Sequence, residues 1–288
     1  MSSFLDVLIA GLILGGIYAL VAMGLSLQYG VARVLNVAHG EFIMLGAMVT
    51  LTLYTKLHIN PLLSVVISGP VIFVLGYLLH WVLFRYIRKK SVSAAVFESN
   101  SILAAFGLLF IIQNIAKQVW GSNFHQYQFM TTSVSIGGSD FGANRLLVLG
   151  ISLCIGTAFY LFLSRTRTGK AIRAAAQDAA TARLMGVNIN VVLALCFGLG
   201  ALLAGIAGIL ISMINQVSAG MGLDYTVVAI IVVVLGGLGS IPGSFIGGFL
   251  LGIVGSIVTN YNPLLALVAY YTIFMVLLIV KPTGILGK

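Results

Sequence analysis

TGKAIRAAAQDAATARLMGV, residues 168–187, lies in one of the two longest polar stretches of an otherwise strongly apolar chain. Seven alanines fall between 171 and 182, which gives this segment a high helix propensity. Thr168 suits a helix N-cap and Gly186 a C-cap, so we expect one short amphipathic helix. Its small alanine face suits a groove in another protein, whereas its Lys and Arg residues suit anionic lipid headgroups. The residues alone leave both interpretations open.

The rest of the chain has the composition of a membrane protein. Of its 288 residues 60% are hydrophobic and 7% charged, whereas a soluble domain is about 25% charged. Apolar runs near the length that crosses a bilayer occur at 7–29, 37–57, 61–84, 101–120, 146–163 and 191–214, followed by a block at 225–280. We therefore expect an all-α polytopic membrane protein with about eight (seven to nine) transmembrane helices, some interrupted by glycine or re-entrant. We expect residues 1–288 to form a single transmembrane domain that contains a polar loop at 164–190.

The net charge of +9 does not indicate nucleic-acid binding, because the basic residues follow apolar runs. They cluster at 85–90 and at 165–183, as the positive-inside rule expects of cytoplasmic loops. Loop 121–145 is then extracytoplasmic, and Lys281 and Lys288 indicate a cytoplasmic C-terminus. The 225–280 block must make an odd number of crossings, either three or one with a re-entrant hairpin, and the N-terminus falls outside.

Both cysteines, Cys154 and Cys196, lie inside apolar runs and are expected as small hydrophobic residues, not as a disulfide. The chain begins without a basic segment and carries Asp6, so we expect the first apolar run to remain as a membrane helix.

Sequence patterns of several enzyme classes are missing. His39-Gly40-Glu41 lacks the Pro-Cys-x-x-Cys partner of zinc deaminases. No His-Glu-x-x-His and no Gly-x-Ser-x-Gly occurs. Gly169-Lys170 has Ser164 in place of the first glycine of a phosphate-binding loop. We expect no catalytic residue, no metal site and no bound cofactor in this chain.

Two glycine-interrupted segments, 30–40 and 236–243, occur in the two halves of the chain. Paired broken segments are typical of a transporter pathway, although glycine also serves tight helix packing. Asn36, His39 and Glu41 follow the first break, and polar groups at this depth need a partner or water. One interpretation is a clasp in which Asn36 caps the helix and Glu41 pairs with Arg33. The other is a gate or pathway lining.

The second segment, GGLGSIPG, either brings helix backbones together or exposes backbone groups to a solute. Its candidate pathway or gate residues are Gly236, Gly237, Gly239, Pro242 and Gly243. Four polar residues that follow the apolar run 191–214 are expected at the outer rim, where they either dock a binding protein or are simply solvated: Asn215, Gln216, Asp224 and Tyr225.

The 168–187 segment resembles the cytoplasmic loop of permeases in the branched-chain amino acid ABC importer family. The resemblance rests on Gly169, Arg173, Ala174, Asp178, Ala182 and Gly186, followed by Val187. Three further stretches resemble the family in the same order: 35–47, 234–252 and 281–287. Within that family the chain resembles the shorter, LivH-type permease subunit.

This resemblance implies an ABC importer permease fold and a multi-pass protein of the bacterial inner membrane. It implies that residues 168–187 couple to two separate ATPase subunits, which bind ATP and Mg²⁺. The other implied partners are a second, LivM-like permease and an extracytoplasmic substrate-binding protein. The implied substrates are branched-chain or related hydrophobic amino acids, with urea, short amides and aromatic or other carboxylates as alternatives within the family.

Two other classes stay open. An ion-coupled secondary transporter would use Asn36, His39 and Glu41 as its ion or proton site, and a scaffolding membrane protein would transport nothing.

Overall fold

The computed structural model describes residues 4–136 and 139–287, so Lys288 lies outside the described residues. Long stretches without proline or polar breaks form helices, and turns fall where polar residues, glycine or proline gather. The helices are α1 (Phe4–Ala32), α2 (His39–Leu57), α3 (Pro61–Leu79), a π-helical turn (His80–Phe84), α4 (Arg85–Lys90), α5 (Ala94–Trp120), α6 (Ala143–Arg165), α7 (Arg167–Gln177), α8 (Ala179–Leu184), α9 (Ile189–Ser212), α10 (Gly222–Gly236), α11 (Ile241–Tyr261), a 3₁₀ turn (Pro263–Leu265) and α12 (Ala266–Val280).

A small antiparallel hairpin interrupts the helices. Strand β1 (Ser133–Ile136) pairs with β2 (Ser139–Gly142), with Val134 opposite Phe141. The hairpin belongs to the polar loop that the sequence assigns to 121–145. It leads directly into α6.

Seven helical segments in the described residues are long and apolar enough to cross a membrane. They are α1, α3 with its continuation to Lys90, α5, α6, α9, α11 and the segment Pro263–Val280. The apolar runs of the sequence therefore correspond to helices, and the all-α polytopic prediction is confirmed. The 225–280 block forms three helices, because Gly237–Ser240 and Asn262 end α10 and α11, and α10 is shorter than the seven candidate spans.

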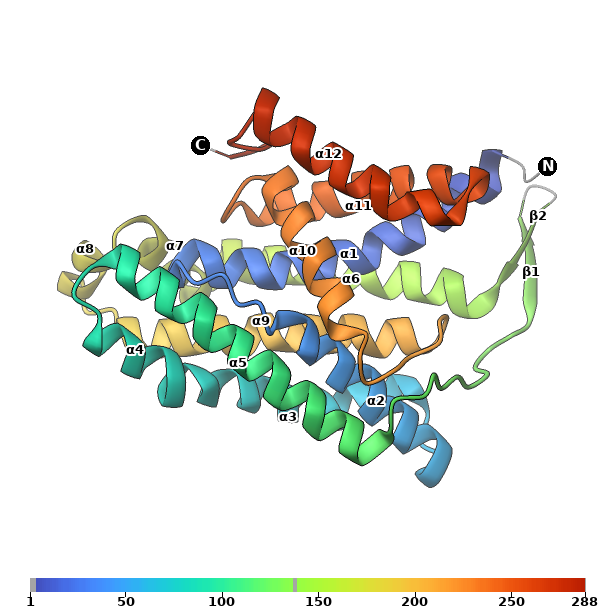
Figure 1. Ribbon diagram of the computed structural model, residues 1–288, viewed down its shortest axis with the longest axis horizontal. Coiled ribbons are helices and arrows are strands. Elements are labelled where there is room, and N and C mark those ends of the chain that lie inside the picture. The colour runs from blue at the N-terminus through green and yellow to red at the C-terminus, as the bar shows by residue number, and fades with distance from the viewer. Residues whose placement is uncertain (1–3, 137–138, 288) are drawn as a thin grey trace.

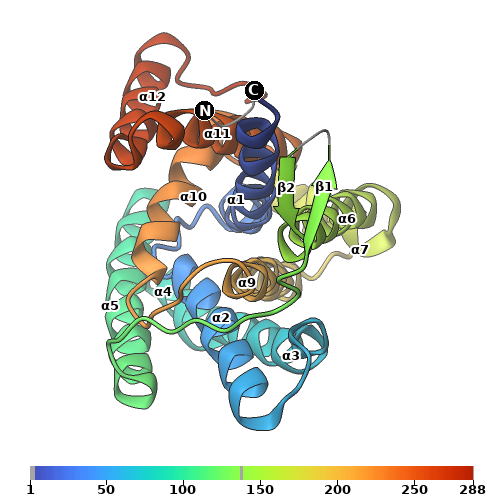
Figure 2. The same cartoon turned by 90° about the vertical axis from the view of Figure 1, so that its right-hand side faces the viewer.

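Helices α1 and α9 form the centre of the bundle (Figure 2). Their apolar stretches are mostly buried, whereas that of α12 is almost entirely exposed. Outer helices present large apolar side chains to their surroundings, among them Val66, Leu103, Phe110 and Ile279. Such a surface suits lipid and not water.

The two ends of the bundle differ in charge. Figure 1 shows α7, α8 and the C-terminus at one end, and the N-terminus and the hairpin at the other. Eleven of the fourteen Lys and Arg residues in the described part of the chain belong to the α7–α8 end: Arg33, Arg85, Arg88, Lys89, Lys90, Arg165, Arg167, Lys170, Arg173, Arg183 and Lys281. The other three, Lys56, Lys117 and Arg145, belong to the hairpin end.

Candidate functional site

The break after α1 carries the chain back into the interior of the bundle. Arg33 has a φ of 56°, which turns the backbone. The ring of His39 then donates from Nε2 to the carbonyl oxygen of Val21, at 3.1 Å. Val21 lies eleven residues before Ala32, about 16 Å along the helix axis. Helix α2 therefore starts about halfway into a hydrocarbon layer of about 30 Å.

Asn36, His39 and Glu41 are all buried, with at most 1% of each side chain exposed. The prediction that Asn36 caps α2 is wrong. Its Oδ1 accepts from the N–H of Ala38 at 3.2 Å, and its Nδ2 donates to Oε1 of Gln28 at 3.4 Å. The amide of Asn36 thus stabilises the turn before the helix, while the first free N–H groups of α2 are left for another partner.

That partner is Thr226 of α10, a residue without any local sequence signal for this role. Its hydroxyl oxygen accepts from the N–H of Gly40 at 2.8 Å. The same oxygen lies 3.1 Å from the carbonyl of Val37 and 3.2 Å from that of Gly222, to either of which it can donate. One hydroxyl therefore joins the end of the first break and the first turn of α2 to the start of α10.

Two glycines permit this approach of α2 and α10. A Cβ on Gly40 would overlap the carbonyl oxygen of Gly222, and a Cβ on Gly222 would lie 2.6 Å from the carboxyl carbon of Glu41. Gly40 is therefore required by the close approach of the two backbones, whereas a side chain at Gly222 would displace the carboxyl group of Glu41. We call Asn36–Glu41 together with Gly222–Thr226 the α2–α10 junction.

The predicted pairing of Glu41 with Arg33 is wrong. Both carboxyl oxygens of Glu41 are buried and have no hydrogen-bond partner among the described residues. The guanidinium of Arg33 lies instead over the ring of Tyr29, 5.9 Å from its centroid. The positive φ of Arg33 turns its backbone out of the helical path of α1, and the first turn of α2 lies deeper in the bundle, beside Val21.

The second glycine segment forms the turn between α10 and α11. Gly237 and Gly239 have φ values of 104° and 81°, where only glycine is unstrained. The hydroxyl of Ser240 caps α11 by accepting from the N–H of Gly243 at 3.2 Å, and Pro242 lies in the first turn of α11. Gly236 and Gly243 are in close backbone contact, so tight helix packing explains this segment.

The C-terminal segment covers that turn. The N–H of Ile285 donates to the carbonyl of Leu235 at 2.9 Å, and that of Leu286 to the carbonyl of Gly236 at 3.0 Å. Gly236 lies ten residues beyond Thr226, about 15 Å along α10. The two glycine segments meet at one point, since a Cβ on Gly30 would lie 3.1 Å from the Cα of Gly239, whereas residues 37–40 meet the opposite end of α10.

The polar segment after α6 forms two helices, so the single helix expected over 168–187 is wrong. The N-cap of α7 is Thr166 and not Thr168, since the hydroxyl of Thr166 accepts from the N–H of Gly169 at 3.0 Å. Asp178 then ends α7 and caps α8, accepting from the N–H groups of Ala180 and Thr181 at 2.8 and 3.2 Å. These hydrogen bonds and the one from the Thr181 hydroxyl hold the pKa of the Asp178 carboxyl below its usual value.

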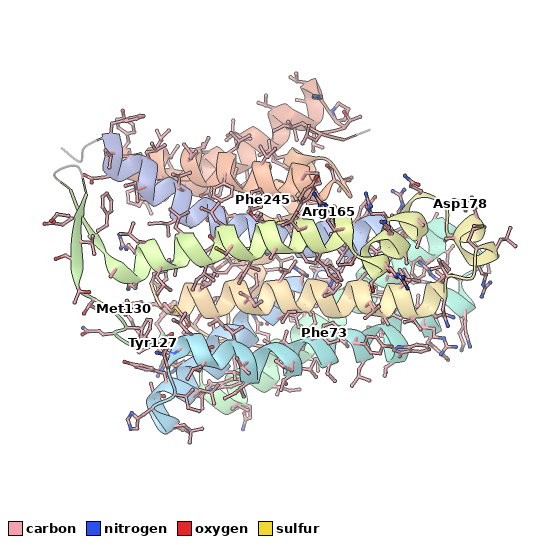
Figure 3. The ribbon with its side chains drawn as sticks, turned by 180° about the vertical axis from the view of Figure 1, so that it is seen from behind. Phe73, Tyr127, Met130, Arg165, Asp178 and Phe245 are labelled. Carbon is pink, nitrogen blue, oxygen red and sulfur yellow. The ribbon has the colours of Figure 1, made fainter. Side chains whose placement is uncertain are left out.

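The surfaces of α7 and α8 are not equivalent. Gly169 is in close contact with the backbone of Leu163, and Ile172 is buried toward the bundle. Arg173 is exposed and donates to the carbonyl of Ser164 at 3.1 Å, while Ala174 is half-buried. Helix α7 therefore lies on the bundle by one face. Figure 3 shows Asp178 at the tip of this end, opposite Tyr127 and Met130.

Helix α8 extends beyond that surface and exposes two large apolar side chains, Leu184 at 87% and Met185 at 81%. Ala182 is buried. The C-cap of α8 is Met185, one residue before the predicted position, and Gly186 follows it with a φ of 84° while the N–H of Val187 donates to the carbonyl of Ala182 at 3.1 Å. The exposed surface of this segment thus combines the alanines Ala179 and Ala180 with larger apolar side chains at its end.

At the hairpin end, the polar loop is fixed to the helices. The hydroxyl of Tyr127 shares a hydrogen bond with that of Ser212 at 2.8 Å, and Tyr54 donates to the carbonyl of Gln128 at 2.8 Å. Of the rim residues, Asn215, Gln216 and Asp224 are exposed and Tyr225 is half-buried.

Seven long apolar helices around a buried junction of two helix starts define a multi-pass membrane protein with the architecture of a permease. Residues 7–281 match the family model described as "Branched-chain amino acid transport system / permease component", and the chain belongs to this family.

Relatives match over almost their full length. The chain is 30% identical to the high-affinity branched-chain amino acid transport system permease protein BraD of Pseudomonas aeruginosa, over 99% of this chain and 96% of that one. It is 29% identical to LivH of Escherichia coli, a permease protein of the same description, over the same shares. A probable LivH of Methanocaldococcus jannaschii is 30% identical over 88% of this chain and 81% of its own.

Among solved structures, PsaBC from Streptococcus pneumoniae in complex with Fab is similar in fold. The TM-score is 0.50 at 14% sequence identity, over 98% of this chain and 93% of that one.

Proposed function

We propose that this chain is the permease subunit of an ATP-driven importer of branched-chain amino acids. The observation that carries the proposal is the family match over 7–281, together with about 30% identity to permeases named for branched-chain amino acid transport. The chain forms the membrane part, and separate ATPase subunits bind ATP and Mg²⁺.

The charge asymmetry of the bundle supports an orientation. Lys and Arg accumulate on the cytoplasmic side of membrane proteins, and the α7–α8 end holds eleven of the fourteen described. That end and the C-terminus then face the cytoplasm, and the hairpin and the N-terminus face outward. We place the protein in the bacterial inner membrane.

The proposed contact with an ATPase subunit is the α7–α8 corner, by which we mean helices α7 and α8 and the turn at Asp178 that joins them. It lies at the basic end, and α8 exposes Leu184 and Met185 in an aqueous region where large apolar side chains mark protein contacts. Arg173 and Asp178 stabilise the corner from within through hydrogen bonds to Ser164 and Thr181. Gly169, Ala174, Ala182 and Gly186 shape it and do not themselves form the contact surface.

The proposed mechanism is alternating access. Helix α9 begins five residues after α8 and packs against α1 and α2, so a displacement of α8 reaches the α2–α10 junction through one continuous helix. In the conformation described here the junction is closed, because Gly40 and Gly222 bring the two backbones into contact. Opening a path there requires the hydrogen bonds of Thr226 to break. A second permease subunit completes the pathway, and a binding protein delivers substrate at the hairpin end.

The test is uptake of radiolabelled L-leucine into proteoliposomes that contain this chain, its partner permease, the ATPase subunits and the binding protein. We expect uptake that requires ATP and is unaffected by collapse of the proton and sodium gradients. Uptake driven by an ion gradient without the ATPases would instead identify a secondary transporter, with Glu41 and His39 as the first residues to replace. Competition by urea, short amides and aromatic carboxylates determines whether the substrate class is the one proposed.

A further inference from the structure

A cavity of about 430 Å³ opens at the hairpin end of the bundle. It lies among the start of α1, strand β2, the start of α6, the residues after α9 and the end of α11, an end seen in Figure 2. None of its lining residues belongs to the α2–α10 junction or to the α7–α8 corner. It is therefore a separate feature of the molecule.

One part of the cavity is apolar. Ile13, Leu14, Phe141 and Ile214 line it, and the first and third of these are almost fully buried. Its volume lies within the range of about 300–1,000 Å³ that is typical of small-molecule sites, which combine apolar walls with a few polar groups.

The other part carries charges of both signs. Asp6 and Asp140 supply carboxylates, and Arg145 supplies a guanidinium. Within the described residues the Arg145 side chain makes no hydrogen bond or ion pair, whereas one carboxylate oxygen of Asp140 accepts from the hydroxyl of Ser135. Asn215 and Thr259 add an amide and a hydroxyl.

We propose that this cavity is a binding site for a free zwitterionic amino acid with an apolar side chain. Arg145 binds the α-carboxylate, since guanidinium and carboxylate form the stronger, charge-assisted class of hydrogen bond. Asp6 and Asp140 attract the α-ammonium, and the four apolar side chains contact a branched aliphatic group. The choice of amino acid rests on the proposed function, and the site extends it by giving the permease its own outward-facing contact with the solute.

A lipid headgroup that carries an ammonium and a phosphate has similar charges. The free amino acid is favoured because charged and apolar residues line one cavity of small-molecule size, which suits a compact ligand with both characters. The experiment separates the two sources.

The assembled transporter, without its binding protein and without ATP, is placed in nanodiscs of phosphatidylcholine and phosphatidylglycerol. Binding of L-leucine is measured by saturation-transfer NMR and by competition. We expect saturable binding that 4-methylpentanoate and 3-methylbutylamine compete for only weakly, since each lacks one charge. Arg145→Gln and Asp6→Asn are each expected to weaken binding about tenfold or more, and Arg145→Lys less.

Lys56→Gln is the matched control for Arg145→Gln, because it removes a positive charge at the same end but outside the cavity. It is expected to leave binding unchanged. Two results overturn the proposal: leucine binding that Arg145→Gln and Asp6→Asn leave intact, or the absence of saturable binding. Retention of phosphatidylethanolamine that depends on Arg145, seen by native mass spectrometry, also overturns it in favour of lipid. Because ATP-dependent uptake is measured separately, intact uptake without this binding refutes the site alone.

Discussion

The hydroxyl of Thr226 and the backbone N–H of Gly40, 186 residues apart in sequence, are joined by a hydrogen bond of 2.8 Å. This bond links the start of α10 to the start of α2 inside the bundle. Replacing Thr226 by valine keeps the shape of the side chain and removes the hydroxyl. We expect it to lower the free energy of unfolding by about 1–3 kcal/mol, because a buried N–H is left without an acceptor.

The measurement is thermal unfolding of the detergent-solubilised complex, with leucine uptake alongside. Thr226→Ser is the control, since it retains the hydroxyl and is expected to restore most of the stability. A stable Thr226→Val protein beside a destabilised Thr226→Ser protein would show that methyl packing, and not the hydrogen bond, is what matters at this position.

Gly40→Ala tests the contact of the two backbones. Its methyl group would overlap the carbonyl oxygen of Gly222, so we expect a loss of about 1–3 kcal/mol and little uptake. Gly107→Ala is the matched control, because Gly107 lies in α5 and a Cβ there meets nothing within 4 Å. Helix propensity favours alanine by about 0.8–1 kcal/mol, so this control is expected to be neutral or stabilising. A Gly40→Ala protein as stable and active as the control would contradict the close contact.

Leu184→Asp combined with Met185→Asp tests the proposed ATPase contact. Both side chains are exposed in this chain, so the bundle should fold normally, while co-purification of the ATPase subunits should fall about tenfold or more. Val92→Asp is the control at the same end of the bundle, since Val92 is 96% exposed and lies outside α7 and α8. If Val92→Asp were as damaging, the interface would be wider than α8 or located elsewhere.

Because the pKa of Asp178 is lowered, we expect the stability of the α7–α8 corner to depend on pH. Its carboxylate accepts from Ala180 and Thr181, and these bonds hold its folded-state pKa below the usual value. The stabilisation is therefore complete above the usual pKa of an Asp side chain and is lost as pH falls through the lowered pKa. Amide hydrogen exchange at residues 180 and 181, corrected for intrinsic rates, should accelerate in that acidic range.

Asp178→Asn still offers a capping oxygen but cannot titrate, so its exchange should lack this acidic step. Asp178→Ala should exchange faster at every pH. A wild-type protein with no acidic step would mean that the carboxylate does not hold the corner.

Much of the fold was accessible from sequence because lipid imposes a simple rule: apolar runs of sufficient length become helices. The helix end near Gly186 was also predictable from sequence, because glycine adopts the left-handed conformation after a helix without strain. The helix break at Asp178 had a signal too, since Asp is among the preferred N-cap residues, but the surrounding alanines outweighed it.

The α2–α10 junction was predictable only in part. Polar residues at 36–41 identified a buried site, as ionisable groups in membrane segments usually do. Thr226 had no such signal, because a single threonine in an apolar helix is unremarkable until its partner is known. Arg33 seemed the natural partner of Glu41 by proximity in sequence, yet its positive φ turns the chain at that position.

The pairing of Ile285 and Leu286 with the end of α10 has a consequence for biogenesis. Ile285 is synthesised fifty residues after Leu235, so the carbonyls of Leu235 and Gly236 are without these donors until the later segment has left the ribosome. A nascent chain that stalls before Ile285 would present an unfinished α10–α11 corner to quality-control proteases. For the same reason, a reporter placed directly after Leu286 needs a linker long enough to leave this pairing undisturbed.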